Sequence, residues 1–435
     1  MSGSVSTGHL PRSLVAARTT IDWLPALPAV AYVVLVLVKL PALVRPLYWD
    51  SDAAGAFVFG SLLRGHGAVE IPRFGFWTSL WWLLATRDLS GHRQLWEGTA
   101  YVFALAAVAF VGWATWRVAG RWAGTAAAAA AVVVGPGALT SLLTVNFHTS
   151  TPFTAALLAA YLVVLAPSRS WLLAAGVGLV AGLNAASDPL LWIAGIAPFA
   201  LAAGVLVLAT KRRDVAGRAA FVLAVSVAVA LATDAVMRSL GFHVIPVGLQ
   251  VSPPADLPND FVGLGKSIAL VFGADHFFPG VYPSAPIRYA ITLLAFAAVA
   301  APLVAAVRLS LRRSEPTLRA FACYWAIAAV LLGLAAWLLT GTIGAGASGS
   351  LNYLLTLAPA AGVGVALLAA RSSAGRIAVT FAIAAVAAVN IADIAHGRAE
   401  EPPGAERYGP QLVRLLERMG LRHGYGGYWD AESLT

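Results

Sequence analysis

The sequence predicts an all-α polytopic membrane protein with about eleven transmembrane helices, and three observations support this fold class. Of its 435 residues, 59% are hydrophobic and only 11% are charged, whereas a soluble globular domain carries about 25% charged residues. The apolar residues form long runs, and a transmembrane helix needs about 20 of them. The charged residues gather between these runs. This composition excludes a wholly soluble enzyme, and the high hydrophobicity excludes intrinsic disorder.

Eleven apolar runs, bounded by charged, Pro, Gly or turn residues, give the predicted helices in chain order. They lie near residues 22–44, 96–116, 122–137, 152–167, 170–187, 190–210, 216–237, 288–308, 318–340, 353–370 and 377–396. The third and fourth runs are short for a membrane span, so we expect them to tilt little or to join through partly buried backbone. The runs form one predicted transmembrane domain, residues 1–397, which a tail of residues 398–435 follows.

Among the short connectors between the predicted helices, basic residues lie on one side of the membrane only. With the N-terminus in the cytoplasm, the connectors on that side contain Arg12 and Arg18, Arg117 and Arg121, Arg169, Lys211 to Arg213 with Arg218, Arg308 to Arg319, and Arg371 with Arg376. The short connectors on the other side, near residues 138–150, 184–189 and 341–352, contain no Lys or Arg. The positive-inside rule therefore predicts a cytoplasmic N-terminus. Eleven spans then predict an exterior C-terminus.

Three long segments lie on the exterior side in this topology: a first exterior loop of residues 45–95, a Pro-rich loop of residues 238–287, and the tail. The first loop is dense in aromatic residues beside charged ones, a pattern typical of helices lying in the membrane interface. The prolines of the second loop predict a structured loop rather than a helix. The chain has 26 Arg against 3 Lys and abundant Ala, which is typical of a high-GC bacterial source. We therefore expect a bacterial plasma membrane protein.

Motifs of soluble enzymes are absent from the sequence. It contains no P-loop, H-E-x-x-H, G-x-S-x-G or C-x-x-C pattern. The single cysteine, Cys323, excludes an intramolecular disulfide and a Cys-based metal site. We expect no cofactor, and the sequence leaves a divalent metal at the exterior acids open. The net charge of +9 follows from the basic connectors, so we expect membrane lipids and no nucleic acid among the partners.

The strongest local signal is Asp50-Ser51-Asp52, directly after the first predicted helix. Two carboxylates this close repel each other, which favours proton uptake by one of them unless a cation compensates. A carboxylate at the membrane boundary, partly shielded by Trp49, can act as a general base toward a hydroxyl. We assign this role to Asp52 and expect Asp50 to pair with Arg45. The alternative is an ordinary hydrated start of a loop.

Further candidates lie in the exterior connectors. Candidate substrate-binding residues are Trp77, Asn146, His148, Asp188, Asn352 and Tyr353. The alternative for the 146–151 segment is capping of the fourth helix, and Asp188 before Pro189 is well placed to cap the sixth. Arg73, Lys266 and Arg288 carry positive charge where the positive-inside rule disfavours it. They either pair with the exterior acids or bind a lipid phosphate.

A cytoplasmic N-terminus, a first helix and a long exterior loop that opens with acidic residues resemble the GT-C superfamily of integral-membrane glycosyltransferases. The tail sequence Gly427-Tyr428-Trp429-Asp430 resembles tails of bacterial members of this group. The resemblance implies interfacial helices in the first exterior loop and an acidic general base, which maps onto Asp50 or Asp52. The chain departs from the mannosyltransferases of that superfamily, whose acidic residues are adjacent, because Ser51 separates the pair here.

The resemblance also implies the chemistry. The donor is a polyprenyl-phosphate-linked sugar, and the acceptor is a glycan, lipid or protein of the cell envelope. Asp52 would take the proton of the acceptor hydroxyl during an inverting displacement, while the lipid phosphate leaves. The alternative from another functional class is a transporter or flippase for a lipid-linked or polar solute. Transporters usually carry polar sites at the membrane midplane in repeated halves, whereas this sequence has no such repeat and almost no charge in the middle of its spans.

Overall fold

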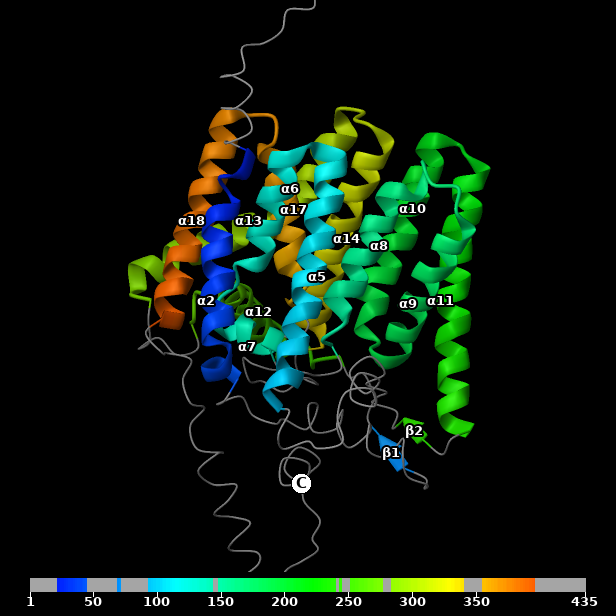
Figure 1. The fold of residues 1–435 in the computed structure, drawn as a ribbon, viewed down its shortest axis with the longest axis horizontal. Helices are drawn as coiled ribbons and strands as arrows, with labels where there is room; N and C mark the ends of the chain where they lie inside the picture. The colour runs from blue at the N-terminus through cyan, green and yellow to red at the C-terminus, as the bar shows by residue number, and fades with distance from the viewer. Residues whose placement is uncertain are drawn as a thin grey trace, which may run out of the picture.

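Each of the eleven predicted apolar runs contains a helix in the computed structural model, which describes residues 22–44, 69–71, 93–143, 148–239, 242–244, 251–276, 283–339 and 354–395. These helices are α2 (Ala26–Val44), α5 (Arg93–Ala119), α6 (Arg121–Val132), α8 (Thr151–Leu165), α9 (Trp171–Ser187), the π-helical turn η1 (Trp192–Ile196) with α10 (Ala197–Thr210), α11 (Arg213–Ser239), α13 (Ala285–Leu311), α14 (Pro316–Leu338), α17 (Leu357–Ala369) and α18 (Ser373–Ala395). They run up and down in one bundle (Figure 1).

The length and apolar composition of the described helices indicate an integral membrane protein. Seven of them are long and apolar enough to cross a membrane, or up to eight if one bent pair counts as a single span. The apolar helices α8, α9 and α17 have only 15, 17 and 13 residues. The expected eleven spans are therefore not confirmed.

The third predicted run, residues 122–137, is wrong as a single helix. α6 ends at Val132, and α7 (Pro136–Leu143) continues at an angle of 86°. The change of direction occurs at Gly135-Pro136, because proline fits the first turn of a new helix but not the interior of an existing one. Two hydrogen bonds satisfy backbone groups that the break leaves without a partner inside a helix. Tyr32 Oη donates to the Val134 carbonyl at 2.8 Å, and the Gly135 N–H donates to the Val271 carbonyl at 2.8 Å.

The expectation of a loop without helix across residues 238–287 is also wrong. This segment contains α12 (Leu257–Val271), with Pro258 in its first turn, where a proline costs no hydrogen bond. It also contains β2 (Phe242–Val244), which pairs in parallel with β1 (Val69–Ile71) of the first exterior loop. The pairing joins the first two of the three long segments that are predicted to be exterior. The predicted interfacial helices of the first loop otherwise lie outside the described residues, as does the tail.

The basic connectors meet at one end of the bundle, which we call the basic end. Arg376, at the start of α18, lies 3.8 Å from Asp22 and 5.5 Å from the ring of Trp122, so the starts of α2, α6 and α18 are together. Figure 1 shows these three helices beginning at the upper end. We call the opposite end the distal end. There the Trp337 indole donates to the Leu257 carbonyl at 2.9 Å, and α7 and α12 lie across the bundle.

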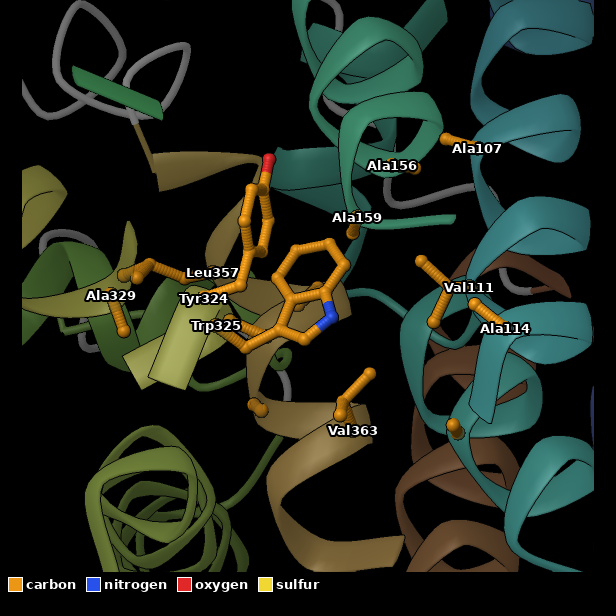
Figure 2. Packing of buried hydrophobic residues seen from close by; sticks show 14 of the residues in the cluster. Ala107, Val111, Ala114, Ala156, Ala159, Tyr324, Trp325, Ala329, Leu357 and Val363 are labelled. Atoms are coloured by element: carbon orange, nitrogen blue, oxygen red, sulfur yellow. The ribbon is translucent and has the colours of Figure 1, made fainter. Parts of the chain in front are cut away.

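Large aromatic side chains fill the centre of the bundle between small ones. Trp325 and Tyr324 of α14 are fully buried, next to alanines and valines of α5, α8 and α17 (Figure 2). The Tyr324 hydroxyl donates to the Ala155 carbonyl at 2.7 Å. Small residues let helices approach closely in a membrane, where association depends on packing and hydrogen bonds. The alanine-rich composition therefore produces tight helix contacts around a few large side chains.

Candidate functional site

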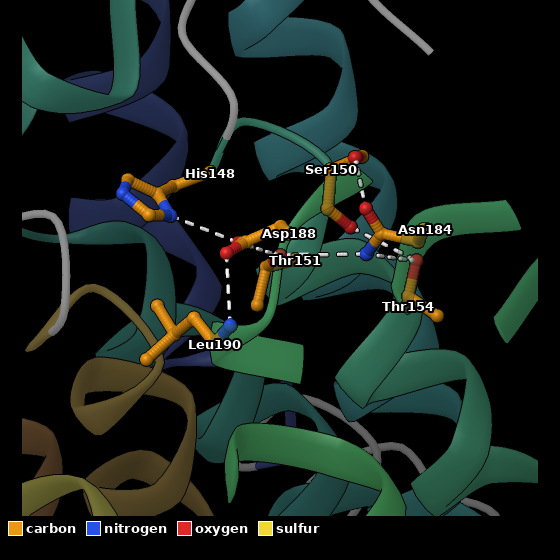
Figure 3. A network of polar contacts seen from close by, with 7 residues as sticks. All are labelled: His148, Ser150, Thr151, Thr154, Asn184, Asp188 and Leu190. Carbon is orange, nitrogen blue, oxygen red and sulfur yellow. Dashed lines mark hydrogen bonds and ion pairs between the residues drawn. The ribbon is translucent and has the colours of Figure 1, made fainter. Parts of the chain in front are cut away.

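A buried network of polar side chains joins the starts of α8 and η1 to the end of α9 at the distal end (Figure 3). The Nδ1 of His148 lies 2.9 Å from Asp188 Oδ2, and the Thr151 hydroxyl donates to the same oxygen at 2.5 Å. Asp188 Oδ1 accepts the Leu190 N–H at 2.9 Å. Both oxygens of this carboxylate therefore have donors.

Asn184 extends the network toward α8. Its side-chain carbonyl accepts from the Ser150 hydroxyl at 2.7 Å, and its amide group donates to the Thr154 hydroxyl at 3.1 Å. Asn184 and Thr154 are fully buried, and Ser150 is nearly so. Polar groups inside a membrane protein are costly unless they are hydrogen-bonded. The network thus stabilises polar side chains at a depth where single ones would destabilise the fold.

The charge of Asp188 is maintained despite its complete burial. Burial by itself raises the pKa of this carboxyl, but the His148 ring, the hydrogen bonds from His148 and Thr151, and the Leu190 N–H together outweigh burial and hold the pKa below its ordinary value. Because a carboxylate can only accept hydrogen bonds, the hydrogen shared with His148 is on Nδ1. Figure 3 shows the other ring nitrogen facing away from Asp188.

This arrangement has a defined chemical capacity. A carboxylate bound to Nδ1 fixes both the tautomer and the orientation of an imidazole, so the lone pair of the neutral ring is on Nε2. His148 is 8% exposed, so its ring is almost completely buried by the described residues. A ring held in this way can accept a hydrogen bond or a proton from a hydroxyl.

The predicted cations Lys266 and Arg288 belong to a second polar cluster at the distal end. The Arg288 guanidinium donates to the Asp275 carbonyl at 3.0 Å, and His276 Nε2 lies 2.7 Å from the Thr292 hydroxyl. Burial lowers the pKa of His276, and the positive charges of Arg288 and Lys266 lower it further. The negative charge of Asp275 acts in the opposite direction, but the net effect is a lowered pKa. Two cations and one carboxylate therefore act on one imidazole, which joins the end of α12 to the start of α13 in one charged cluster.

The structure brings some of the predicted site residues together, and others lie outside the residues that it describes. His148 and Asp188 are in contact, and Lys266 and Arg288 share the neighbourhood of His276. The capping hypothesis for Asp188 is also confirmed, because it accepts the Leu190 N–H. Capping of α8 by Ser150 is wrong, since that hydroxyl donates to Asn184 instead. The remaining candidates lie outside the described residues: Asp50, Asp52, Arg73, Trp77, Asn146, Asn352 and Tyr353.

Thr154 and His276 are among the cluster residues that sequence reasoning missed as candidates. Thr154 is indistinguishable in sequence from any hydroxyl near a helix start, and only its contact with Asn184 reveals its role. His276 follows Asp275 in the Pro-rich loop predicted to be exterior, and an imidazole beside a carboxylate was a usable signal. Among the described residues, no group of three or more His, Cys, Asp or Glu is placed to hold a metal ion.

Comparisons with protein-family models, curated proteins and solved structures find no match to this chain.

Proposed function

We propose that this protein is a membrane glycosyltransferase. It transfers a sugar from a polyprenyl-phosphate-linked donor to a hydroxyl of an envelope glycan, lipid or protein at the distal end, which we assign to the cell exterior. The observation that supports this best is the location of both polar clusters at the distal end. One cluster holds an oriented imidazole, and the other gathers two cations around His276.

The reaction has two requirements, and residues of the two clusters contribute to both. The acceptor hydroxyl must lose a proton as it attacks the anomeric carbon, and we assign that proton to Asp52, with His148 as a hydrogen-bond acceptor that orients the reacting hydroxyl. The departing lipid phosphate is already a weak base, so it needs charge stabilisation rather than a general acid. Lys266 and Arg288 supply that positive charge, with Arg73 as a further candidate.

The decisive experiment measures sugar transfer by the purified full chain in nanodiscs, with radiolabelled polyprenyl-phosphate sugars and an envelope extract. General-base catalysis contributes about 10²–10⁴-fold. Asp52→Asn should therefore insert and bind the donor normally but transfer sugar at least about a hundredfold more slowly. Arg288→Gln should weaken donor binding, whereas Arg213→Gln at the basic end is the matched control and should leave it unchanged. A wild-type rate in Asp52→Asn would remove that residue as the base.

One structural observation favours a second candidate function, a transporter or flippase. The bent pair α6–α7 is a broken helix, and transporters bind solutes at such breaks. The break here lies among Val133, Val134 and Gly135 and carries no charged side chain. If wild-type protein in liposomes moves a lipid or solute and transfers no sugar from any donor, the transporter assignment replaces the glycosyltransferase.

A further inference from the structure

An apolar groove of about 520 Å³ lies between α2, α5 and α6. Its walls are aliphatic side chains and alanines of these three helices, among them Val30, Val108 and Ala128. Val30 and Val34 on its α2 side are 58% and 52% exposed, so the groove is open along the surface of the bundle. In a membrane protein such a surface contacts acyl chains.

The groove extends from the basic end toward the middle of the bundle. Trp23 and Arg121, at the starts of α2 and α6, line one end, and Leu105 and Val132 line the other. Along α5 the lining runs from Leu105 to Trp116, which is about 17 Å of helix at 1.5 Å per residue. That length is close to half of a hydrocarbon core of about 30 Å. The groove therefore matches the depth of one leaflet.

Arg121 gives the groove a positive end. Its guanidinium lies 5.9 Å from the centre of the Trp116 ring, and within the described residues no carboxylate lies within ion-pair distance of it. Asp22, just before α2, is beside Arg376 instead, at 3.8 Å. Arg121 also begins α6, whose N-terminal backbone carries partial positive charge. A cation without an acidic partner at the membrane boundary is complementary to an anionic head group.

We propose that this groove binds one anionic phospholipid from the leaflet at the basic end. Its phosphate contacts Arg121, and one of its acyl chains lies between α2, α5 and α6. Indole rings suit the polar–apolar boundary of a bilayer, and Trp23, Trp113 and Trp116 line the groove beside the head-group position. Because the groove lies in the half of the bundle away from Lys266 and Arg288, this lipid is distinct from the proposed sugar donor.

The test is native mass spectrometry of the full chain with equal amounts of phosphatidylglycerol and phosphatidylcholine that carry identical acyl chains. One basic residue near an anionic surface is worth about 1 kcal/mol, or about fivefold in affinity. We expect wild-type protein to prefer phosphatidylglycerol by at least about fivefold, and Arg121→Gln to lose that preference. Ala109→Trp, at an exposed position in the groove wall, should reduce binding of both lipids.

Arg117→Gln is the matched control, because Arg117 is exposed on the last turn of α5 and does not line the groove. It should keep the preference for phosphatidylglycerol. The proposal is overturned if Arg121→Gln binds both lipids as wild type does, or if Arg117→Gln loses the preference equally. Displacement of the lipid by an equimolar amount of polyprenyl phosphate would also overturn it. These outcomes do not depend on whether the protein transfers sugar.

Discussion

At Tyr32, one hydroxyl group satisfies the backbone at the break between α6 and α7. Tyr32 is fully buried and donates to the Val134 carbonyl at 2.8 Å. Tyr32→Phe leaves that carbonyl without its donor in an apolar environment, which costs about 1–3 kcal/mol. We expect a lower melting temperature in detergent for this variant. Tyr101→Phe is the matched control, since the buried Tyr101 hydroxyl has no partner among the described residues, and its loss should be neutral or stabilising. Equal melting temperatures for Tyr32→Phe and wild type would contradict this account.

Asp188 gives a prediction that depends on pH. Its pKa is lowered in the folded protein, so its contribution to stability is fully present above the ordinary carboxyl pKa of 3.8 and is lost as the pH falls through the folded-state value. Asp188→Asn should lower the melting temperature at pH 7, with a cost of about 1–3 kcal/mol from weakened buried hydrogen bonds. The difference from wild type should shrink as the pH falls below 3.8. A difference that stays constant from pH 7 to pH 3 would argue against a buried carboxylate.

Individual residues of the site were more predictable than their contacts. His148 and Asp188 each stand out in sequence, because they are polar residues in short connectors without Lys or Arg. Their pairing depends on how α8 packs against α9, across a separation of 40 residues, and no local pattern encodes it. Thr154 was not predictable for the same reason.

Among the helices, α9 and α11 depend on two glycines for their packing. A side chain at Gly178 or Gly182 would come within 2.9 and 2.6 Å of the backbone carbonyls of Val222 and Ser226. Small residues four positions apart let membrane helices approach to backbone contact. Gly182→Ala should therefore destabilise the protein, even though alanine favours a helix by about 1 kcal/mol over glycine.

Gly176 of the same helix supplies the control for this prediction. A Cβ at Gly176 meets nothing within 4 Å, so Gly176→Ala should stabilise by about 0.5–1 kcal/mol through helix propensity alone. Melting temperatures of the two variants in one detergent decide the question. Stabilisation by both would show that α9 and α11 do not pack at this distance.

The ends of the helices were predictable where hydropathy falls at the point at which the chain reverses direction, as it does at the basic connectors. The break at Gly135-Pro136 was not, because hydropathy stays high across it while the helix turns. α12 was missed for the opposite reason: prolines surround it and obscured a segment that can still form a helix. The contacts of Val271 and Gly135 show that these two elements stabilise each other, which single-segment reasoning does not detect.

For the whole molecule, the prediction to test is the orientation in the membrane. Ser284 before α13 and Ser372 before α18 are exposed residues at the distal end and the basic end. In a Cys323→Ala background, Ser284→Cys should react with an impermeant thiol reagent added to intact cells. Ser372→Cys should react only after the cells are opened. The reverse pattern would place the distal end in the cytoplasm and would exclude an exterior active site.

The length of α9 has a consequence for the surrounding bilayer. Its 17 residues span about 25 Å, less than a hydrocarbon core of about 30 Å. Trp171, Leu172 and Leu179 on its outer face are exposed, so lipid chains contact this short helix directly. If α9 crosses the membrane, we expect this hydrophobic mismatch to thin the bilayer locally, at a cost of fractions of a kcal/mol per Å. Thinning of this kind would draw the head groups next to α9 inward toward Asp188. A sugar carried on a lipid phosphate, as proposed above, would then approach the buried network without leaving its own leaflet.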